Sequence, residues 1–473
     1  MFPAPVLEAL RMTPGRTAIE HGGREITCGE LLTTVARMAA GLRAAGLGPG
    51  DGVALLTGTN PDAYAAHLAA HALGCRVAAF RPRWSAAQIA DALGHRVDAL
   101  IVEPGASPGP LDVPILDTAT LRSHPAEPLT SSARPDDIAR VTFTSGSTDR
   151  PKGCAQTYRA FSTAYQRDDW PPQLAALMTA FQRCLVYESL ASPVMMTYLG
   201  RCLVAGGTAI MTDENLTPAL LERHRVTATM MPAPRLQVLL ATQHYHPADL
   251  TALRAVVLNG TPADPGLLAA AIDRLGPIIW QGYGKAESGL IAMLTPTDIA
   301  TCPDALTTVG RPLPTVTLSI RDHSGQIWVR TPHMMSMYWN NPSQTAEAVQ
   351  DGWLHTRDTG YLGPDGLLRL TSGETIPITA ETCYPTTIER LLTTHPSVSQ
   401  AYVTTTPDST IHAFVVPTPG HQIDDQALQS LITSSLSASH TPQTITVLTT
   451  VPTTPAGKPD TRALATLLPL LTP

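Results

Sequence analysis

A loop of small hydroxyl residues and glycine follows a short apolar run, and it ends in Pro-Lys-Gly. The run at residues 139–143 predicts a strand. Backbone N–H groups and hydroxyls in such a loop can surround a polyphosphate, and a lysine adds a mobile positive charge. A plain surface turn is the alternative, and the P-loop spacing G-x-x-x-x-G-K-[ST] is absent. We expect phosphate binding by Thr144, Ser145, Gly146, Ser147, Thr148 and Lys152.

Lysine is rare in this chain. Lysine and arginine together number 32, and the lysines are Lys152, Lys285 and Lys458. Because arginine carries nearly all the positive charge, each lysine is a candidate for a role that needs a compact, flexible ammonium. Lys152 and Lys458 lie within motifs, so chance retention is the weaker account for them. The sequence leaves the role of Lys285 open.

Three further motifs follow the loop in order. Residues 280–288 read Trp-Gln-Gly-Tyr-Gly-Lys-Ala-Glu-Ser, residues 352–361 read Gly-Trp-Leu-His-Thr-Arg-Asp-Thr-Gly-Tyr, and Lys458 lies in Ala-Gly-Lys. With the loop, they resemble the signature motifs of the adenylate-forming superfamily, which includes acyl-CoA synthetases, peptide-synthetase adenylation domains and luciferases. The resemblance covers about residues 15–465. It implies that a carboxylate attacks the α-phosphate of Mg·ATP, giving an acyl-adenylate and pyrophosphate.

The resemblance also implies roles for individual residues. Tyr283 would stack on adenine, Asp358 would bind both ribose hydroxyls, and Lys458 would stabilise charge in the transition state. Glu287 is both a catalytic residue and a Mg²⁺ ligand in this scheme, and Thr148 is a second metal contact. Arg369 is a stand-in for a ribose-contacting arginine of the family. The other expected nucleotide contacts are Asn259, Gly260, Thr261, Gln281, Gly282, Gly284 and Ala286.

The same resemblance places one wall of an acid-binding pocket near residues 185–193. We expect Glu188, Ser192 and Gly282 to line it. Glu188 is a candidate for binding an amine on the substrate, and a solvated or helix-capping glutamate is the alternative.

The chain departs from the family pattern at several positions. Asp149 and Arg357 stand where the family has glycine, Ala286 replaces a threonine, and the Gly-Gly loop that helps form the pantetheine tunnel gives way to residues near 379–380. An acid–CoA ligase is the first hypothesis. The altered loop favours instead an amine, a carrier-protein thiol, or activation of an oxyanion such as nitrite to modify an aryl amine. An inactive nucleotide-binding relative is the hypothesis from another class.

The length of 473 residues predicts more than one domain. Strand and helix signals alternate over residues 15–105, with a capping box at Thr27 and Glu30, which predicts a parallel, helix-covered sheet. We expect an α/β fold with a large, multi-subdomain N-terminal domain at residues 1–370. A small, mobile α+β lid at residues 371–473 would follow, with a hinge near 372–375.

Composition narrows the partners and the compartment. A net charge of −7 argues against nucleic acid, and no apolar run reaches membrane-spanning length. The N-terminus lacks the features of a signal peptide, and the 7 scattered cysteines predict free thiols in a reducing cytoplasm. His67 and His71 lie four residues apart on one expected helix, where packing is a better interpretation than metal binding.

Overall fold

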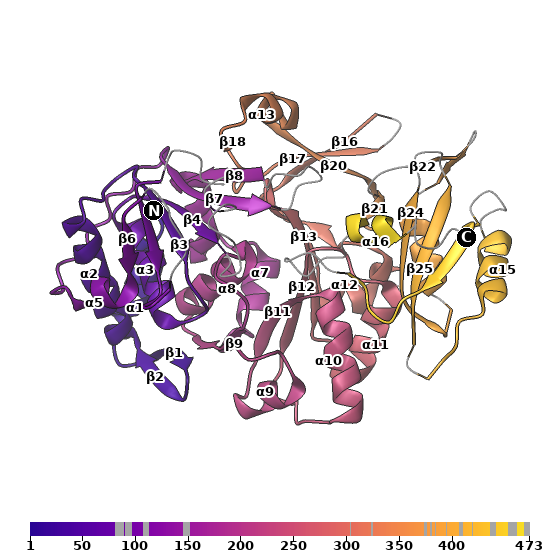
Figure 1. Ribbon diagram of the computed structural model, residues 1–473, viewed down its shortest axis with the longest axis horizontal. Coiled ribbons are helices and arrows are strands. Elements are labelled where there is room, and N and C mark those ends of the chain that lie inside the picture. Colours follow the sequence, from indigo (N-terminus) through magenta and orange to yellow (C-terminus); the bar gives the residue numbers. More distant parts are fainter. Residues whose placement is uncertain are drawn as a thin grey trace.

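The computed structural model describes residues 1–80, 89, 97–106, 113–144, 152–302, 304–322, 325–372, 376–378, 381–383, 385–393, 395–405, 410–418, 420–435, 441–452 and 461–467. These residues form a large α/β domain followed by a small α+β domain at one end of the molecule (Figure 1). The expected fold class is therefore confirmed.

The largest sheet has parallel strands at its centre and antiparallel strands at its edges. In spatial order it comprises β15 (Arg311–Pro312), β14 (Gly289–Leu294), β13 (Ile279–Lys285), β12 (Ala255–Asn259), β11 (Ala228–Pro232), β9 (Arg183–Val186), β10 (Thr208–Met211), β1 (Thr17–His21) and β2 (Arg24–Thr27). The pairs from β1 to β13 are parallel, while β2, β14 and β15 run antiparallel to their neighbours.

A second large sheet carries the strands on either side of the expected phosphate loop. Its order is β18 (Met337–Tyr338), β8 (Lys152–Thr157), β7 (Ile138–Thr144), β4 (Arg76–Phe80), β3 (Gly52–Leu56), β5 (Ala99–Val102) and β6 (Ile115–Asp117). Strands β3, β4, β5, β6 and β7 pair in parallel, as the alternation of strand and helix predicts. β7 and β8 pair antiparallel, with Thr144 opposite Lys152.

The helices of the large domain are α1 (Ala4–Met12), α2 (Cys28–Ala44), α3 (Pro61–Ala72), α5 (Thr118–Ser123), α6 (Tyr158–Ser162), α7 (Pro172–Met178), α8 (Pro193–Val204), α9 (Pro218–Arg223), α10 (Ala233–Tyr245), α11 (Pro265–Leu275), α12 (Pro296–Thr301) and α13 (Pro342–Ala348). The capping box is confirmed at the start of α2, where Thr27 and Glu30 satisfy each other's backbone N–H groups.

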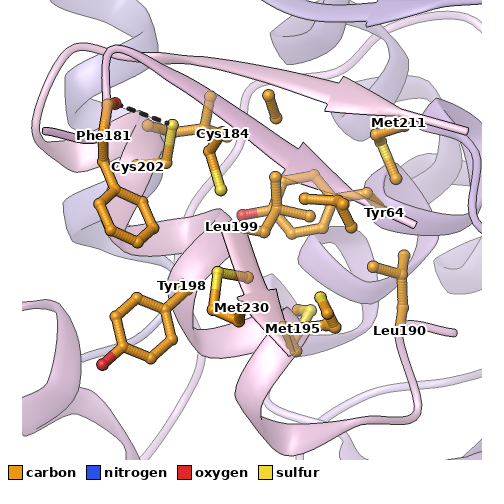
Figure 2. Close-up of a cluster of buried hydrophobic side chains, with 14 of the residues drawn as sticks. Tyr64, Phe181, Cys184, Leu190, Met195, Tyr198, Leu199, Cys202, Met211 and Met230 are labelled. Carbon is orange, nitrogen blue, oxygen red and sulfur yellow. Dashed lines mark hydrogen bonds between the residues drawn. The ribbon is translucent and has the colours of Figure 1, made fainter. Parts of the chain in front are cut away.

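The main core lies where helices of the two large sheets meet. Figure 2 shows Tyr64 of α3 beside Leu199 and Met195 of α8, with Cys184 of β9 in the same cluster. Small alanines on α3 allow this close packing, and every residue from Ala63 to Ala72 is buried. From Ala63 onward, α3 therefore lies in the interior.

His67 and His71 of α3 belong to this core. His71 Nδ1 lies 3.1 Å from the Tyr158 hydroxyl, and its ring meets Phe2 edge to face. Burial lowers the pKa of His67 to about 4. Both rings are therefore packing groups that stay neutral at pH 7.

A smaller sheet follows in the large domain, and two more belong to the C-terminal domain. The first comprises β16 (Thr317–Arg321), β17 (Gln326–Arg330), β19 (Val349–Gln350), β20 (Trp353–Leu362) and β21 (Leu368–Ser372). The C-terminal elements are β22 (Ile376–Ile378), β23 (Glu381–Cys383), α14 (Pro385–Thr393), β24 (Val398–Thr405), β25 (Ile411–Pro417), α15 (Asp425–Ser435), β26 (Thr444–Val447) and α16 (Thr461–Leu467). The C-terminal domain has its own apolar core around β24, β25, α14 and α15.

The C-terminal domain contacts α10 and α11 of the large domain through polar groups. The Thr393 hydroxyl donates to Asp264 at 2.8 Å, and the Gln237 side-chain amide donates to the Ser399 carbonyl at 3.1 Å. The Gln400 amide also contacts Gln237. Polar contacts of this kind are easier to break and re-form than a large apolar interface.

Five of the described cysteines are buried free thiols, namely Cys28, Cys75, Cys154, Cys184 and Cys202. Within the described residues, no helix combines the length and the apolar character that crossing a bilayer requires.

Candidate active site

One cavity of about 1310 Å³ collects most of the residues that the sequence motifs single out. Its walls come from all the main parts of the fold: Lys152 of β8, Tyr283 of β13, Asp358 of β20 and, from the C-terminal domain, Gln400 of β24. The site therefore lies where the large domain meets the small one.

Asp358 is held in this cavity by two donors. The Tyr283 hydroxyl donates to Oδ2 at 2.7 Å, and Lys285 Nζ donates to Oδ1 at 3.0 Å. Lys285 Nζ also donates to the backbone carbonyl of Thr356. Tyr283 and Lys285 are two residues apart on β13, so both side chains extend from the same face of the strand.

A β-bulge in β20 directs Asp358 toward this pair. Gln326 of β17 pairs with Thr359, and Trp328 pairs with His355. The stretch between these two pairs is longer in β20 than in β17, so β20 contains the extra residues of the bulge. Arg357 lies in this bulge with a φ of 63°, a left-handed conformation that favours glycine. The left-handed backbone explains why the family has glycine at this position, and arginine adopts that conformation here.

Gly284 lies between the two donors and lines the cavity. A Cβ atom at this position would lie 2.2 Å from the Gly289 carbonyl oxygen, so only glycine fits. Burial, and next the Asp358 carboxylate, raise the pKa of Tyr283. Its phenol therefore keeps its proton and can donate it to Asp358 in a hydrogen bond.

Glu287 forms a second polar group in the cavity. The Tyr338 hydroxyl donates to Glu287 Oε1 at 2.8 Å, and Lys152 Nζ lies 5.6 Å from the centre of the Tyr338 ring. Tyr338 belongs to β18, which pairs with β8 and so brings the carboxylate near the phosphate-loop lysine. Burial, followed by the charge of Glu287, raises the pKa of Tyr338.

The cavity also includes other residues expected from the sequence. Its lining contains Glu188, Ser192, Asn259, Gly260, Thr261, Gly282 and Ala286. Thr144 ends β7 opposite Lys152. The remaining phosphate-loop candidates Ser145, Gly146, Ser147 and Thr148, the catalytic candidate Lys458, and residues 373–375 and 379–380 lie outside the described residues.

Gln281 does not line the cavity, contrary to expectation. Its side chain is buried, accepts from the Ala263 backbone N–H at 2.7 Å and donates to the Thr308 carbonyl at 3.2 Å. These bonds fasten the loop after β12 to the start of β13. Gln281 is therefore a positioning residue for Asn259–Thr261 and makes no contact with the cavity itself.

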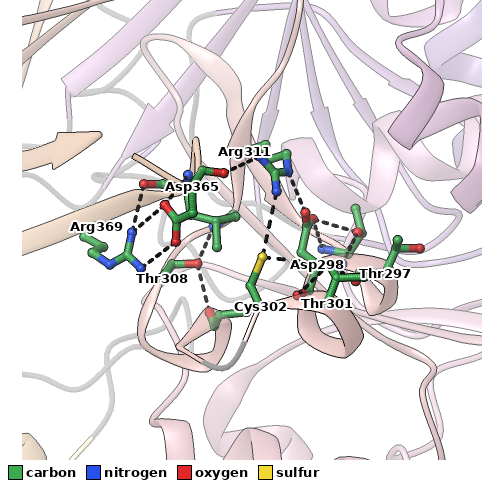
Figure 3. Close-up of polar contacts among 12 residues, drawn as sticks. Thr297, Asp298, Thr301, Cys302, Thr308, Arg311, Asp365 and Arg369 are labelled. Atoms are coloured by element: carbon green, nitrogen blue, oxygen red, sulfur yellow. Dashed lines mark hydrogen bonds and ion pairs between the residues drawn. The ribbon is translucent and has the colours of Figure 1, made fainter. Parts of the chain in front are cut away.

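Arg369 is also placed differently from the expectation. It forms a two-pronged ion pair with Asp365, at 2.7 and 2.9 Å, and is not part of the cavity lining (Figure 3). The pair spans four residues across the turn between β20 and β21, so the local partner engages the guanidinium. Asp365 engages the guanidinium in this arrangement, and a ribose contact by Arg369 stays a prediction.

The sequence reasoning missed several residues of the cavity. Lys285 was left without a role, although the scarcity of lysine marked it. Arg140 and Arg201 line the cavity, as does His333. Arg140 could have been noticed as a charged residue inside the apolar run of β7, while Arg201 and His333 come from distant segments and carry no local signal.

Comparisons with known proteins agree with this geometry. Residues 6–339 match the family of AMP-binding enzymes, and residues 387–458 match the AMP-binding enzyme C-terminal domain. A feruloyl-CoA synthase of an Amycolatopsis species is 30% identical, with 96% of each chain covered. The amide bond synthetase McbA of Marinactinospora thermotolerans is 32% identical with a TM-score of 0.84, covering 98% of this chain and 100% of that one.

An O-succinylbenzoate coenzyme A synthetase of Bacillus subtilis in complex with AMP has the same fold, with a TM-score of 0.83 at 24% identity and 97% of each chain covered. Fold and site together define an AMP-forming ligase. The chain belongs to the AMP-binding enzyme family, which is the adenylate-forming superfamily that its motifs resemble.

Proposed function

We propose that this enzyme activates a small carboxylic acid with Mg·ATP as its acyl-adenylate and then transfers the acyl group to the thiol of coenzyme A. The observation that carries the proposal is the pair of polar groups in one cavity, Asp358 with Tyr283 and Lys285, and Glu287 with Tyr338. The first suits a ribose and the second suits a metal-bound phosphate.

Asp358 fits a ribose because of how its oxygens are used. An ionised carboxylate offers about four acceptor sites, two on each oxygen. Tyr283 takes one site on Oδ2, and Lys285 takes one on Oδ1. One site on each oxygen is left for the two ribose hydroxyls, and the protein donors fix the direction in which those sites point.

Glu287 and Lys152 fit a magnesium nucleotide. Mg²⁺ is commonly held by one or two carboxylates together with substrate phosphates, so a single carboxylate suffices. Among the described residues no group of three or more metal-ligating side chains occurs, which suits a metal that arrives with the nucleotide. Bound there, Mg²⁺ would neutralise phosphate charge. Glu287 would orient the ion, and Lys152 would contact the leaving phosphates with the loop after Thr144.

Lys458 completes the proposal as the residue that stabilises charge when the carboxylate attacks the α-phosphate. The C-terminal domain that carries it would rotate between the two half-reactions about a hinge near residues 372–375, with a domain boundary near 370. Its polar contacts with α10 and α11 are compatible with such motion. The free buried thiols support a reducing, cytoplasmic location.

An amine acceptor is the second candidate, and a specific observation favours it. The family's Gly-Gly loop is replaced in the segment before Pro385, and the similar amide bond synthetase forms amides by its printed name. The feruloyl-CoA synthase favours coenzyme A. Both candidates share the adenylation step.

The test is ATP–pyrophosphate exchange with a panel of aryl and short acyl acids, amino acids and nitrite. Each positive acid is then followed to product with coenzyme A, with amines, and with neither. Exchange plus a thioester only when coenzyme A is present supports the proposal, and an amide without a thioester supports the second candidate. Binding of ATP without exchange for any acid would reject both in favour of an inactive relative.

A further inference from the structure

Two arginines gather at the end of the cavity that lies against α6. Arg140 of β7 donates through Nε to the Gln156 side-chain oxygen at 2.6 Å, and Arg201 of α8 donates through Nε to the Ala164 carbonyl at 2.8 Å. The Arg140 guanidinium lies 4.4 Å from the centre of the Phe161 ring. Both charges therefore stand against one short segment, residues 160–165.

Arg201 is buried, Arg140 is partly buried, and no carboxylate in the described part of the chain pairs with either. Arg201 is only 5% exposed. Within the part of the chain that the structure describes, no aspartate or glutamate lies within ion-pair distance of either guanidinium. Their hydrogen-bond partners are neutral groups: the Gln156 side-chain oxygen for Arg140, and the Ala164 carbonyl and the Tyr198 side chain for Arg201. Burying an unpaired charge is costly, so this arrangement weakens the fold unless a ligand supplies the counter-charge.

Burial and the charge of the two arginines affect the pKa of a neighbouring histidine, His333. His333 lines the same end, and its Nδ1 lies 2.6 Å from the Thr163 hydroxyl. Burial, and next the charges of Arg201 and Arg140, lower the pKa of His333 to about 4. The histidine is neutral at pH 7 and adds no competing charge. Burial also lowers the pKa of both arginines.

The position of Arg140 along β7 sets its distance from the expected phosphate loop, where the acid would be activated. Arg140 precedes Thr144 by four residues, which is roughly 13 Å along an extended strand. Thr144 begins the expected phosphate loop. A group bound by the arginines would therefore be separated from the activated carboxylate by a ring or a short chain.

We propose that Arg140 and Arg201 form an anion subsite for a second carboxylate, one that is not activated, so that the substrate is a dicarboxylic acid or an equally charged analogue. The guanidinium terminal nitrogens suit a planar carboxylate. Which carboxylate is activated rests on the proposed function, whereas the anion subsite rests on two guanidiniums that line the cavity without a carboxylate partner among the described residues.

Binding is measured first, without ATP, by calorimetry and thermal unfolding. The probes are benzene-1,3- and 1,4-dicarboxylates with their dimethyl esters, which carry no charge, and acetate with its neutral analogue acetamide. We expect the diacid to bind at least about tenfold more tightly than its ester, and acetate but not acetamide to raise the unfolding temperature. Acetate is small enough to reach the arginines whatever the shape of the natural acid.

The variants are Arg140→Met and Arg201→Met, with Arg274→Met as the matched control. Arg274 also lines the cavity but is exposed, on α11. Each of the first two should weaken diacid binding roughly 30-fold, abolish the acetate effect and leave the ester within about twofold. Each should also unfold at a higher temperature than the wild type without ligand, because a charge with little access to water and no carboxylate partner among the described residues is gone. Arg274→Met should change none of these.

A merely structural role predicts the opposite signature. Lower unfolding temperatures for the two variants, with diacid and ester affected alike, would overturn the anion subsite, as would a wild type that acetate fails to stabilise. Exchange activity with monoacids but no preference for diacids would reject the subsite and retain the proposed function. Arginine-dependent diacid binding without exchange for any acid would retain the anion subsite and reject the proposed function.

Discussion

Asp358→Asn is the sharpest test of the nucleotide site, because the structure assigns each acceptor position of the carboxylate. In the wild type, Tyr283 and Lys285 each donate to a different oxygen. Asparagine keeps one oxygen and replaces the other by an NH₂ group, which donates. That NH₂ group must face either the tyrosine hydroxyl or the lysine ammonium, both of which are also donors.

The size of the effect follows from this geometry. The ribose loses one acceptor, and the remaining one loses its charge. Hydrogen bonds to charged groups contribute about 1.5–3 kcal/mol, so ATP binding should weaken roughly 30-fold or more. The Lys285 and Asp358 side chains are 32% and 19% exposed, which limits the cost of breaking their ion pair. The free energy of unfolding should therefore fall by only about 1 kcal/mol.

The assay compares ATP with 2′-deoxy-ATP and 3′-deoxy-ATP by calorimetry. Wild-type enzyme should bind each deoxy analogue about tenfold more weakly than ATP, and for Asp358→Asn at least one of these differences should shrink to within about twofold. Asp365→Asn is the matched control, because that carboxylate is also held by a cation, Arg369, but outside the cavity. A wild type that binds ATP and both analogues equally would refute the assignment of Asp358 to the ribose.

Three more predictions follow from groups around the cavity and in the core. Glu287→Gln should raise the Mg²⁺ concentration for half-maximal exchange roughly tenfold while leaving thermal unfolding nearly unchanged, because Tyr338 can still donate to the amide oxygen. His67, with a pKa of about 4 against 6.5 unfolded, takes up its proton only in the unfolded chain, so stability is full above pH 6.5 and declines toward pH 4 by on the order of 3 kcal/mol. In urea titrations at pH 8 and pH 5, His67→Leu should therefore lose less stability than the wild type, and an equal loss would contradict the assignment. Arg357→Gly should raise the urea midpoint, by up to about 1 kcal/mol in free energy, since it relieves a left-handed arginine, and a lowered midpoint would show that the side chain matters more than the backbone.

The elements that sequence reasoning predicted well are those whose signals are local. The capping box fixes the start of α2, and Asn60 followed by proline fixes the start of α3. Tyr283, Glu287 and Asp358 come from short motifs, and the fold brings all three to one cavity. Asp358 is far along the chain from Tyr283 and Glu287, so its meeting with them depends on the order of the strands, which the family resemblance supplied.

The residues outside the cavity lining are placed by contacts that no short pattern encodes. Gln281 lies inside a motif, yet its amide bridges two loops in the interior. Arg369 is a stand-in for the family's ribose-contacting arginine, and a carboxylate four residues earlier pairs with it. Lys285 was undecided because its partner, Asp358, lies on another sheet. In each case the side chain's partner, and not its own residue type, determines what it does.

Arg140 shows how the partners of a side chain, more than its residue type, bear on which acid the pocket selects. The motifs of the chain describe how a nucleotide is held, and every member of the family needs that. We propose that the acid is recognised by residues spread over β7, α8 and the segment before β18, where a single unusual side chain would change the chemistry of the pocket. A buried and a partly buried guanidinium without a carboxylate partner among the described residues destabilise the fold, and protein stability is too marginal to carry such a cost without a function that uses it. The end of the cavity with the uncompensated arginine charges is therefore where we expect the substrate to bind.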